Sequence, residues 1–305
     1  MLNPILASSA LRRMRSVRTI VIIGVYVAVL MALLCLGMST FIFGSSFYIN
    51  SMSAGITTYC LLMAAQFALI VLVAPAMTAG SIAGERERQT LELLLVTNTG
   101  SLSIVFGKLM ESFAFLALLI FSGLPVMCLT MLLGGISILQ ILTGMLFLLV
   151  CAFAAACVGI LCSSFMKNTV AATIISYVLI LLIGIGTIVP LLTSIDKKSI
   201  TDVLYDNAAY AAMSQMDGFR MMPKLLLVNP GVGLISLIED QTAFIQQNFA
   251  GGHGRLYATF LMMKKIGYNI VPFINMAFMV ITALVLLLLA ARLVRPRHVR
   301  IRRKV

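Results

Sequence analysis

The sequence predicts an all-α integral membrane protein with six transmembrane helices. Of its 305 residues, 61% are hydrophobic and only 10% are charged, whereas about 25% of the residues of a soluble globular chain are charged. The apolar residues form continuous runs of about 20 or more, the length that crosses a hydrocarbon core about 30 Å thick. Because backbone amides inside lipid must be paired within their own segment, each run is expected to be helical. A β-barrel is excluded, since barrel strands alternate apolar and polar residues over about ten positions.

The apolar runs give the positions of the spans, which we expect near residues 19–44, 57–81, 103–133, 136–163, 170–192 and 269–292. The first run is longer than the core of a cleaved signal peptide, about 7–15 residues, so it is predicted to remain as a span. The third run contains Pro125, which removes a helix hydrogen bond and predicts a kink or a tilt. The Gly134-Gly135 turn after it predicts a tight hairpin.

The distribution of charge predicts the orientation. Four arginines precede the first run and seven basic residues follow the last, within a net charge of +12. Of the short connections, those on the same side as these clusters carry Arg86, Arg88, Lys108 and Lys167, and those on the other side carry no basic residue. Basic residues concentrate on the cytoplasmic side of membrane proteins, so both termini are predicted in the cytoplasm. Lipid is therefore the expected partner of these charges, and nucleic acid is not.

We treat residues 1–305 as a single transmembrane domain with three parts outside the spans. Residues 1–18 form a cytoplasmic basic segment, 193–268 an extracytoplasmic region and 293–305 a cytoplasmic basic tail. Within the extracytoplasmic region, an apolar stretch is interrupted by Asn229-Pro230-Gly231 and is too short to span. It predicts a re-entrant or interfacial helix; an apolar patch on a small external subdomain is the alternative.

The connection between spans two and three is a dense cluster of charges followed by a short leucine-rich run. On a helix, Leu91, Leu94 and Leu95 share one face, and Glu85, Arg88 and Glu92 line the other. Such a helix can lie along the membrane surface and offer its charges to a cytoplasmic partner. A solvated interfacial loop is the alternative.

This connection resembles the first cytoplasmic loop of the type-2 ATP-binding cassette (ABC) permease family, in which an acidic-basic cluster precedes Gly/Gln-Thr-Leu-Glu and a leucine-rich turn. The chain has Gln89 where glycine is common. Asn3-Pro4-Ile5-Leu6 followed by arginines is similar to the family's amphipathic entry helix. Gly107-Lys108 is similar to its opening of span three, and Asn229-Pro230 to the residues before its re-entrant helices.

The resemblance implies a permease subunit, most members of the family being exporters, in the bacterial cytoplasmic membrane, paired with a second permease chain. The family binds no cofactor itself, and ATP and Mg²⁺ bind to a separate ATPase subunit. The implied contacts with that subunit are Glu85, Arg86, Glu87, Arg88, Thr90, Leu91 and Glu92 in a coupling helix, with Lys167 in the next loop as a lesser contact. A nucleotide site at Gly107-Lys108 is excluded, because a P-loop needs glycine at 102 and serine or threonine at 109, where the chain has Leu102 and Leu109.

The remaining polar residues support weaker hypotheses. Lys108 and Glu111 are expected to form an ion pair near the membrane surface, either as an anchor or as a functional charge. Gln66 and Gln140 are predicted to hydrogen-bond between helices or to line a polar path. The six cysteines and two histidines show no metal-site spacing, so no metal is expected. A secondary transporter or channel, or less favourably an intramembrane enzyme, is the alternative function; it would need inverted repeats or converging catalytic groups, which the sequence does not show.

Overall fold

The computed structural model describes residues 17–43, 51–90, 101–194, 229–242 and 271–294. In these residues the chain forms α2 (Val17–Phe43), α3 (Ser51–Thr78), α4 (Gly80–Glu87), α6 (Ser101–Ser122), α7 (Leu124–Leu133), α8 (Ile138–Phe165), α9 (Thr169–Ser194), α13 (Pro230–Thr242) and α16 (Val271–Val294). The predicted amphipathic entry helix, most of 193–268 and most of the basic tail lie outside the described residues.

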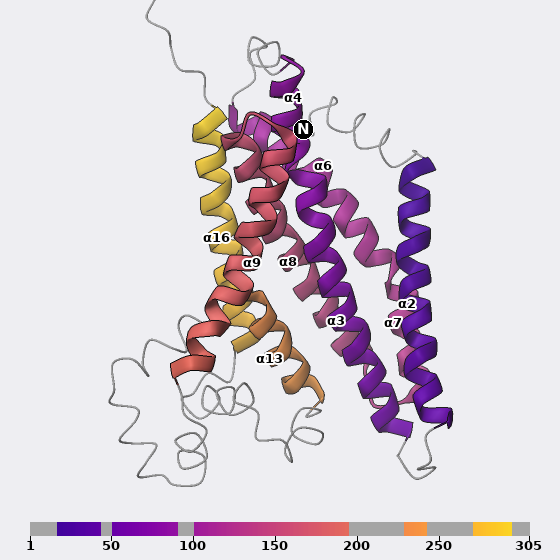
Figure 1. Cartoon of the computed structure of the whole chain (residues 1–305). Coiled ribbons are helices and arrows are strands. Elements are labelled where there is room, and N and C mark those ends of the chain that lie inside the picture. The colour runs from indigo at the N-terminus through magenta and orange to yellow at the C-terminus, as the bar shows by residue number, and fades with distance from the viewer. Residues whose placement is uncertain (1–16, 44–50, 91–100, 195–228, 243–270, 295–305) are drawn as a thin grey trace, which may run out of the picture.

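Six helices within the described residues are long and apolar enough to cross a membrane, which confirms the predicted number of spans. They cover Thr19–Ser39, Gly55–Glu87, Ser101–Leu133, Ile138–Phe165, Thr169–Gly186 and Pro272–Val294. Figure 1 shows them as a bundle of roughly aligned helices, with α2 at one side and α16 at the other. Large apolar side chains such as Leu132 and Leu182 are exposed around the bundle, as expected for a surface that lipid covers.

The third span is broken, as its proline predicted. α6 ends at Ser122 and α7 begins at Leu124, with Gly123 between them as the N-cap of α7. Pro125 is the second residue of α7, where its missing N–H takes no hydrogen bond away from the helix. The third span is therefore interrupted at Gly123, two residues before the proline.

The predicted hairpin between spans three and four is also confirmed. Gly134 and Gly135 have φ of 89° and 84°, the left-handed region that glycine adopts without steric cost. α8 then begins after Ser137, whose hydroxyl accepts the backbone N–H of Gln140 at 3.3 Å. The carbonyl of Gly134 lies against Gly55 on α3, where a Cβ would overlap it.

α8 is the central helix of the bundle. The buried share of its most apolar segment is 61%, whereas the corresponding share is 17% in α2 and 11% in α9. α8 packs on α3, α6, α9 and α16. Small residues allow this close approach. A Cβ on Gly159 would lie 2.8 Å from the Cβ of Thr78, and one on Gly144 would lie 2.8 Å from the hydroxyl of Tyr59.

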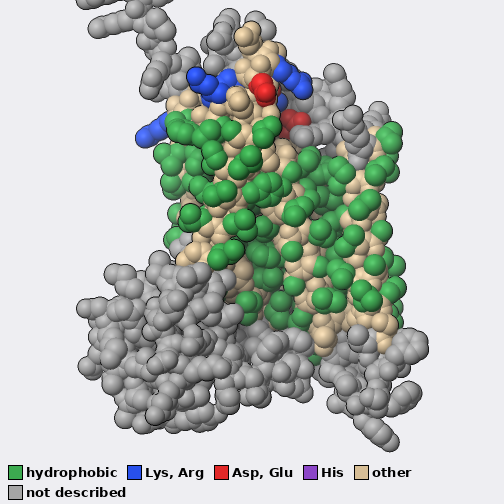
Figure 2. Space-filling model, in the orientation of Figure 1, with side chains coloured by type: hydrophobic (Ala, Val, Ile, Leu, Met, Phe, Trp, Pro, Cys, Tyr) green, Lys and Arg blue, Asp and Glu red, His purple; other side chains and the backbone are tan. Residues whose placement is uncertain are grey.

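Charged side chains gather at one end of the bundle, which we call the charged end. Figure 2 shows basic and acidic side chains there and an apolar surface below. The residues concerned lie on or next to α4, in the first half of α6, after the end of α8 and in the last turn of α16: Glu85, Arg86, Glu87, Arg88, Lys108, Glu111, Lys167 and Arg292.

Candidate functional site at the charged end

The short helix α4 is attached to the connection between α8 and α9. The hydroxyl of Ser163 accepts the backbone N–H of Ile82 at 2.9 Å and that of Ala83 at 2.8 Å. One guanidinium nitrogen of Arg86 donates to the carbonyl oxygen of Met166 at 3.0 Å. Since Ser163 is fully buried, its two bonds to α4 are shielded from water, which strengthens them. We call this set of contacts the α4 joint.

Glu87 extends the joint to the start of α9. Its carboxylate accepts the hydroxyl of Thr169 at 3.0 Å and the backbone N–H of Thr169 at 3.4 Å. The first N–H groups of a helix lack partners within the helix, and its N-terminus carries a partial positive charge. A carboxylate there is therefore favourable, and Glu87 acts as a cap supplied by another helix.

Lys108 on α6 ties the other side of α4. Its ammonium lies 2.6 Å from a carboxylate oxygen of Glu85 and 3.9 Å from one of Glu111. The side chains of Lys108, Glu85 and Glu111 are 28%, 20% and 16% exposed, so water screens the three charges only partly. The sequence predicted the Lys108–Glu111 pair, but the shorter contact is with Glu85. Glu85 is thus turned toward the bundle.

The coupling helix predicted to run through Glu92 ends earlier. α4 stops at Glu87 with Arg88 as its C-cap, and Gln89 has φ of 59°. The N–H of Thr90 donates to the carbonyl of Glu85 at 2.9 Å, and that of Gln89 to the carbonyl of Arg86 at 3.1 Å. These two bonds form a Schellman motif, which closes a helix with a left-handed residue.

The prediction of one continuous helix through Glu92 is therefore wrong, but Arg88 stays at the end of α4, where its N–H donates to the carbonyl of Gly84 at 3.1 Å. The left-handed Gln89 turns the chain away after Arg88, so Thr90 leaves the helix axis. Leu91 and Glu92 lie outside the described residues, and the apolar face predicted for Leu91, Leu94 and Leu95 stays a prediction.

Replacing Gln89 by glycine is expected to stabilise the chain by about 1 kcal/mol, because a residue with a Cβ pays about that much to adopt the left-handed conformation. The measurement is the thermal unfolding midpoint of the purified chain in detergent. Gln89→Ala is the matched control: it also removes the long side chain but keeps the Cβ, so its midpoint should not rise. Equal midpoints for the two variants would contradict this account of the left-handed cap.

The outer surface of the α4 joint presents a small set of exposed side chains. Arg88 and Thr90 at the end of α4 are exposed, as are Lys167 and Asn168 between α8 and α9. Since the joint holds these two segments together, their exposed residues form one surface, which we call the joint surface. Of the predicted contact residues, Arg88, Thr90 and Lys167 lie on it, and Glu87 lies at its edge, where it is exposed but bonded to Thr169.

The two glutamines predicted to act within the spans have different surroundings. Gln66 on α3 is fully buried, and among the described residues neither side-chain oxygen nor nitrogen has a hydrogen-bond partner. It packs against Gly123, where a Cβ would overlap its amide. The side-chain oxygen of Gln140 accepts the N–H of Ser137 at 2.7 Å, so it caps its own helix. The bond between helices is made by the Gln140 carbonyl, which accepts the Tyr59 hydroxyl at 3.1 Å.

Asn229 joins three helices far from the charged end. Its side-chain oxygen caps α13 by accepting the N–H of Gly231 at 2.8 Å, while its side-chain nitrogen donates to the carbonyl of Gly184 on α9 at 2.8 Å. Its backbone carbonyl accepts the side chain of Asn275 on α16 at 3.2 Å. Pro230 follows at the first position of α13, where proline is favoured.

These contacts attach the Asn229-Pro230-Gly231 stretch to two of the spanning helices, and its re-entrant placement stays a prediction. Gly184 and Asn275 both lie inside helices long enough to span. α13 has 13 residues, or about 20 Å of helix, too short to cross. α13 begins directly after Asn229, which binds Gly184 and Asn275. The helix packs on α16, α8 and α3. Figure 1 shows α13 running from the lower part of α16, near the start of that helix where Asn275 binds Asn229, toward the end opposite the charged one.

A comparison with known families finds a match that covers nearly the whole chain. The family model described as ABC-2 family transporter protein matches residues 5–297. A search of curated proteins found no match. The match includes the α4 joint, the broken third span and α13, so the resemblance carried by residues 84–94 extends over all six spans.

Proposed function

The chain belongs to the ABC-2 transporter family, and from this premise we propose that it is the permease subunit of an ATP-driven exporter. The charged end faces the cytoplasm of a bacterial cell, where a separate ATP-binding cassette subunit binds ATP and Mg²⁺ and docks on the joint surface. A second permease chain, identical or related, completes the pathway. The basic residues at the charged end support this orientation, because such residues concentrate on the cytoplasmic side.

The observation that carries the proposal is the attachment of α4 to the rest of the bundle. α4 continues α3, is hydrogen-bonded to the end of α8 through Ser163 and is ion-paired to α6 through Lys108. Glu87 adds the first residue of α9. A force applied to α4 is therefore transmitted to four spans at once. Rigid helices that move together are what switches a transporter between two packings.

The contacts divide the predicted coupling residues into two groups. Glu85, Arg86 and Glu87 are bound to residues of this chain, so we propose that they position α4. Arg88, Thr90 and Lys167 are exposed and are the residues proposed to meet the ATPase. Charges at the rim of such an interface set its register and its rate of assembly more than its affinity.

Charge reversal on the joint surface tests this assignment. In the chain co-expressed with an ATP-binding cassette subunit that assembles with it, we expect Arg88→Glu combined with Lys167→Glu to weaken assembly about tenfold or more, since like charges across an interface are repelled. The measurement is permease-stimulated ATP hydrolysis in proteoliposomes as a function of subunit concentration. The loss should shrink at high salt, which screens exposed charges.

Arg292→Glu is the matched control, because Arg292 is exposed in the last turn of α16 at the same end of the bundle. It should leave ATP hydrolysis unchanged. Unchanged stimulation in the double variant, or an equal loss with Arg292→Glu, would remove the joint surface as the docking site.

A further inference from the structure

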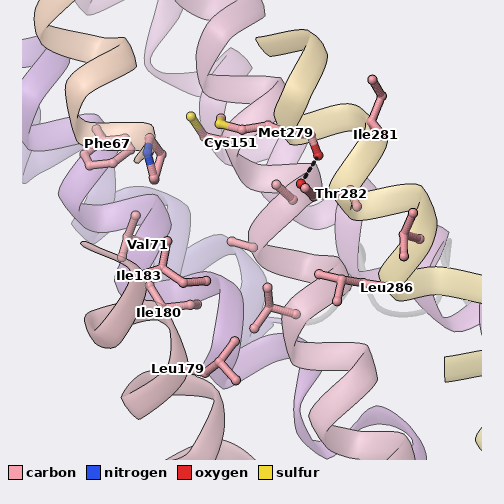
Figure 3. A pocket seen from close by; sticks show the side chains of 16 residues that line it. Phe67, Val71, Cys151, Leu179, Ile180, Ile183, Met279, Ile281, Thr282 and Leu286 are labelled. Carbon is pink, nitrogen blue, oxygen red and sulfur yellow. Dashed lines mark hydrogen bonds between the residues drawn. The ribbon is translucent and has the colours of Figure 1, made fainter. Parts of the chain in front are cut away.

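A cavity of about 380 Å³ lies inside the bundle, away from the α4 joint. Its walls come from α3, α8, α9 and α16, and Pro230 at the start of α13 also lines it. Figure 3 shows Ile180 and Ile183 on one side of the cavity and Thr282 and Leu286 on the other. The volume is within the range of small-molecule sites, about 300–1,000 Å³.

The lining of the cavity is apolar. Its one hydroxyl, on Thr282, already donates to the carbonyl of Met279 at 2.9 Å. Apart from the thiol of Cys151, the other lining side chains are hydrocarbon, thioether or aromatic. A buried water needs two to four polar partners, and apolar cavities stay dry and bind apolar molecules. Water is therefore a poor occupant, and the chemistry favours a hydrocarbon.

The cavity opens sideways toward the surroundings of the bundle. α9 and α16 both line it but make few direct contacts with each other. At its edge on α16, Ile281 is 60% exposed and Val285 is 51% exposed. Because exposed apolar side chains in a spanning helix face lipid, the opening faces hydrocarbon.

The size and direction of the cavity select one kind of occupant. Along α16 the lining runs from Met279 to Leu286, and along α8 from Cys151 to Val158, which is about 10 Å parallel to the helices. A single extended hydrocarbon chain, aligned with the chains of the surrounding bilayer, has this shape.

We propose that this cavity is a binding site for one hydrocarbon chain of a membrane amphiphile, which enters between α9 and α16. The chain belongs either to a bilayer phospholipid that stays bound or to a single-chain amphiphile. The site does not depend on the proposed coupling to an ATPase, since the walls are formed by this chain alone.

Tryptophan fluorescence tests the proposal cleanly because the chain contains no tryptophan. Phe67→Trp places a single fluorophore in the cavity wall. Phe278→Trp is the matched control on α16, with 36% of the side chain exposed outside the cavity. The full-length chain in non-quenching detergent is titrated with 9,10-dibromostearic acid, or with a phosphatidylcholine that has one dibrominated chain.

We expect quenching of Phe67→Trp to saturate, whereas that of Phe278→Trp should rise in proportion to the brominated fraction. If quenching saturates with both probes, one chain of a bilayer phospholipid can occupy the cavity. If it saturates with the fatty acid alone, the site is selective for a single-chain amphiphile. Proportional quenching at both positions overturns the proposal. So does an absence of quenching at Phe67→Trp with emission that changes with protein concentration, because a second copy of the chain would then cover the cavity.

Filling the cavity gives a second test. Ala155 lines it and is partly buried, so Ala155→Phe in the Phe67→Trp background should abolish the saturable quenching. Ala277→Phe, at an exposed position of α16 outside the cavity, should leave it intact. If Phe67→Trp does not fold, Leu179→Trp on α9 reports from the opposite wall. Saturable quenching that survives Ala155→Phe would overturn the assignment to this cavity.

Discussion

Gly159→Ala is expected to lower the stability of the bundle by about 2–3 kcal/mol, the upper range for an inserted methyl group in a packed core. The new Cβ would overlap the hydroxyl of Thr78 and lie 2.8 Å from its Cβ. Thr78 is fully buried, and its hydroxyl donates to the carbonyl of Ala74 at 2.8 Å. It cannot rotate away without losing that bond, so α3 and α8 must separate where α3 meets α4.

The readout is the temperature at which the buried thiols of Cys157 and Cys162 react with a maleimide in detergent, because both flank the substituted position. Gly24→Ala is the control: no atom lies within 4 Å of a Cβ there, and alanine is a better helix former than glycine. Thr78→Ala added to Gly159→Ala should restore much of the stability. Equal behaviour of Gly159→Ala and Gly24→Ala would show that α3 and α8 do not approach this closely.

Lys108→Met is expected to have the second largest effect, about 2 kcal/mol. Removing one partner of a buried ion pair costs about 3–5 kcal/mol because it leaves the other charge unpaired, and the partial exposure of these side chains lowers that figure. Here two carboxylates, Glu85 and Glu111, lose their shared cation. The measurement is thermal unfolding of the purified chain, together with ATP hydrolysis in the assembled transporter.

A double-mutant cycle with Glu85→Gln isolates the pair. The double variant should be more stable than the sum of the single effects predicts, because each change removes the cost left by the other. Lys108→Arg should keep much of the stability, since a guanidinium can still reach both carboxylates. Additive effects in the cycle would mean that the 2.6 Å contact between Lys108 and Glu85 contributes nothing to stability.

The spans could be predicted because their cause is local. A run of about 20 apolar residues can be satisfied in lipid only as a helix, so run length gave six spans whose number is confirmed. The same holds for the break near Pro125 and for the Gly134-Gly135 turn, where the residue type limits the backbone directly. The attachment of Asn229 to α9 and α16 could not be predicted, because the local sequence does not identify its partners Gly184 and Asn275.

The end of α4 could not be predicted because its signal is missing. Glycine is the usual left-handed residue of a Schellman motif, and the chain has Gln89 there, inside a stretch of good helix formers. Helical spacing therefore extended the helix to Glu92 and placed Glu85 on an outward face. Its actual partner, Lys108, lies on another helix, and spacing along the sequence gives only local pairs such as Lys108 and Glu111.

The role of Gln140 was visible in the sequence but was missed. Ser137 and Gln140 have the spacing of a capping box, in which each side chain binds the other's backbone N–H, and the structure has both bonds. Placing the start of span four at residue 136 put Gln140 inside the span. The polar side chain of Gln140 then suggested contacts between helices, whereas this side chain caps the start of its own helix.

The α4 joint has a consequence for how such a protein can change over evolutionary time. The bonds that hold α4 use the side chains of Ser163, Arg86 and Glu87. Between α8 and α9, the partner of Arg86 is the backbone carbonyl of Met166 and not a side chain. The neighbouring side chains of Lys167 and Asn168 are exposed and take no part in these bonds. Substitutions at these two positions can therefore accumulate without loosening the helix. The exposed residues of the joint surface can in this way change while the contacts that position α4 stay the same.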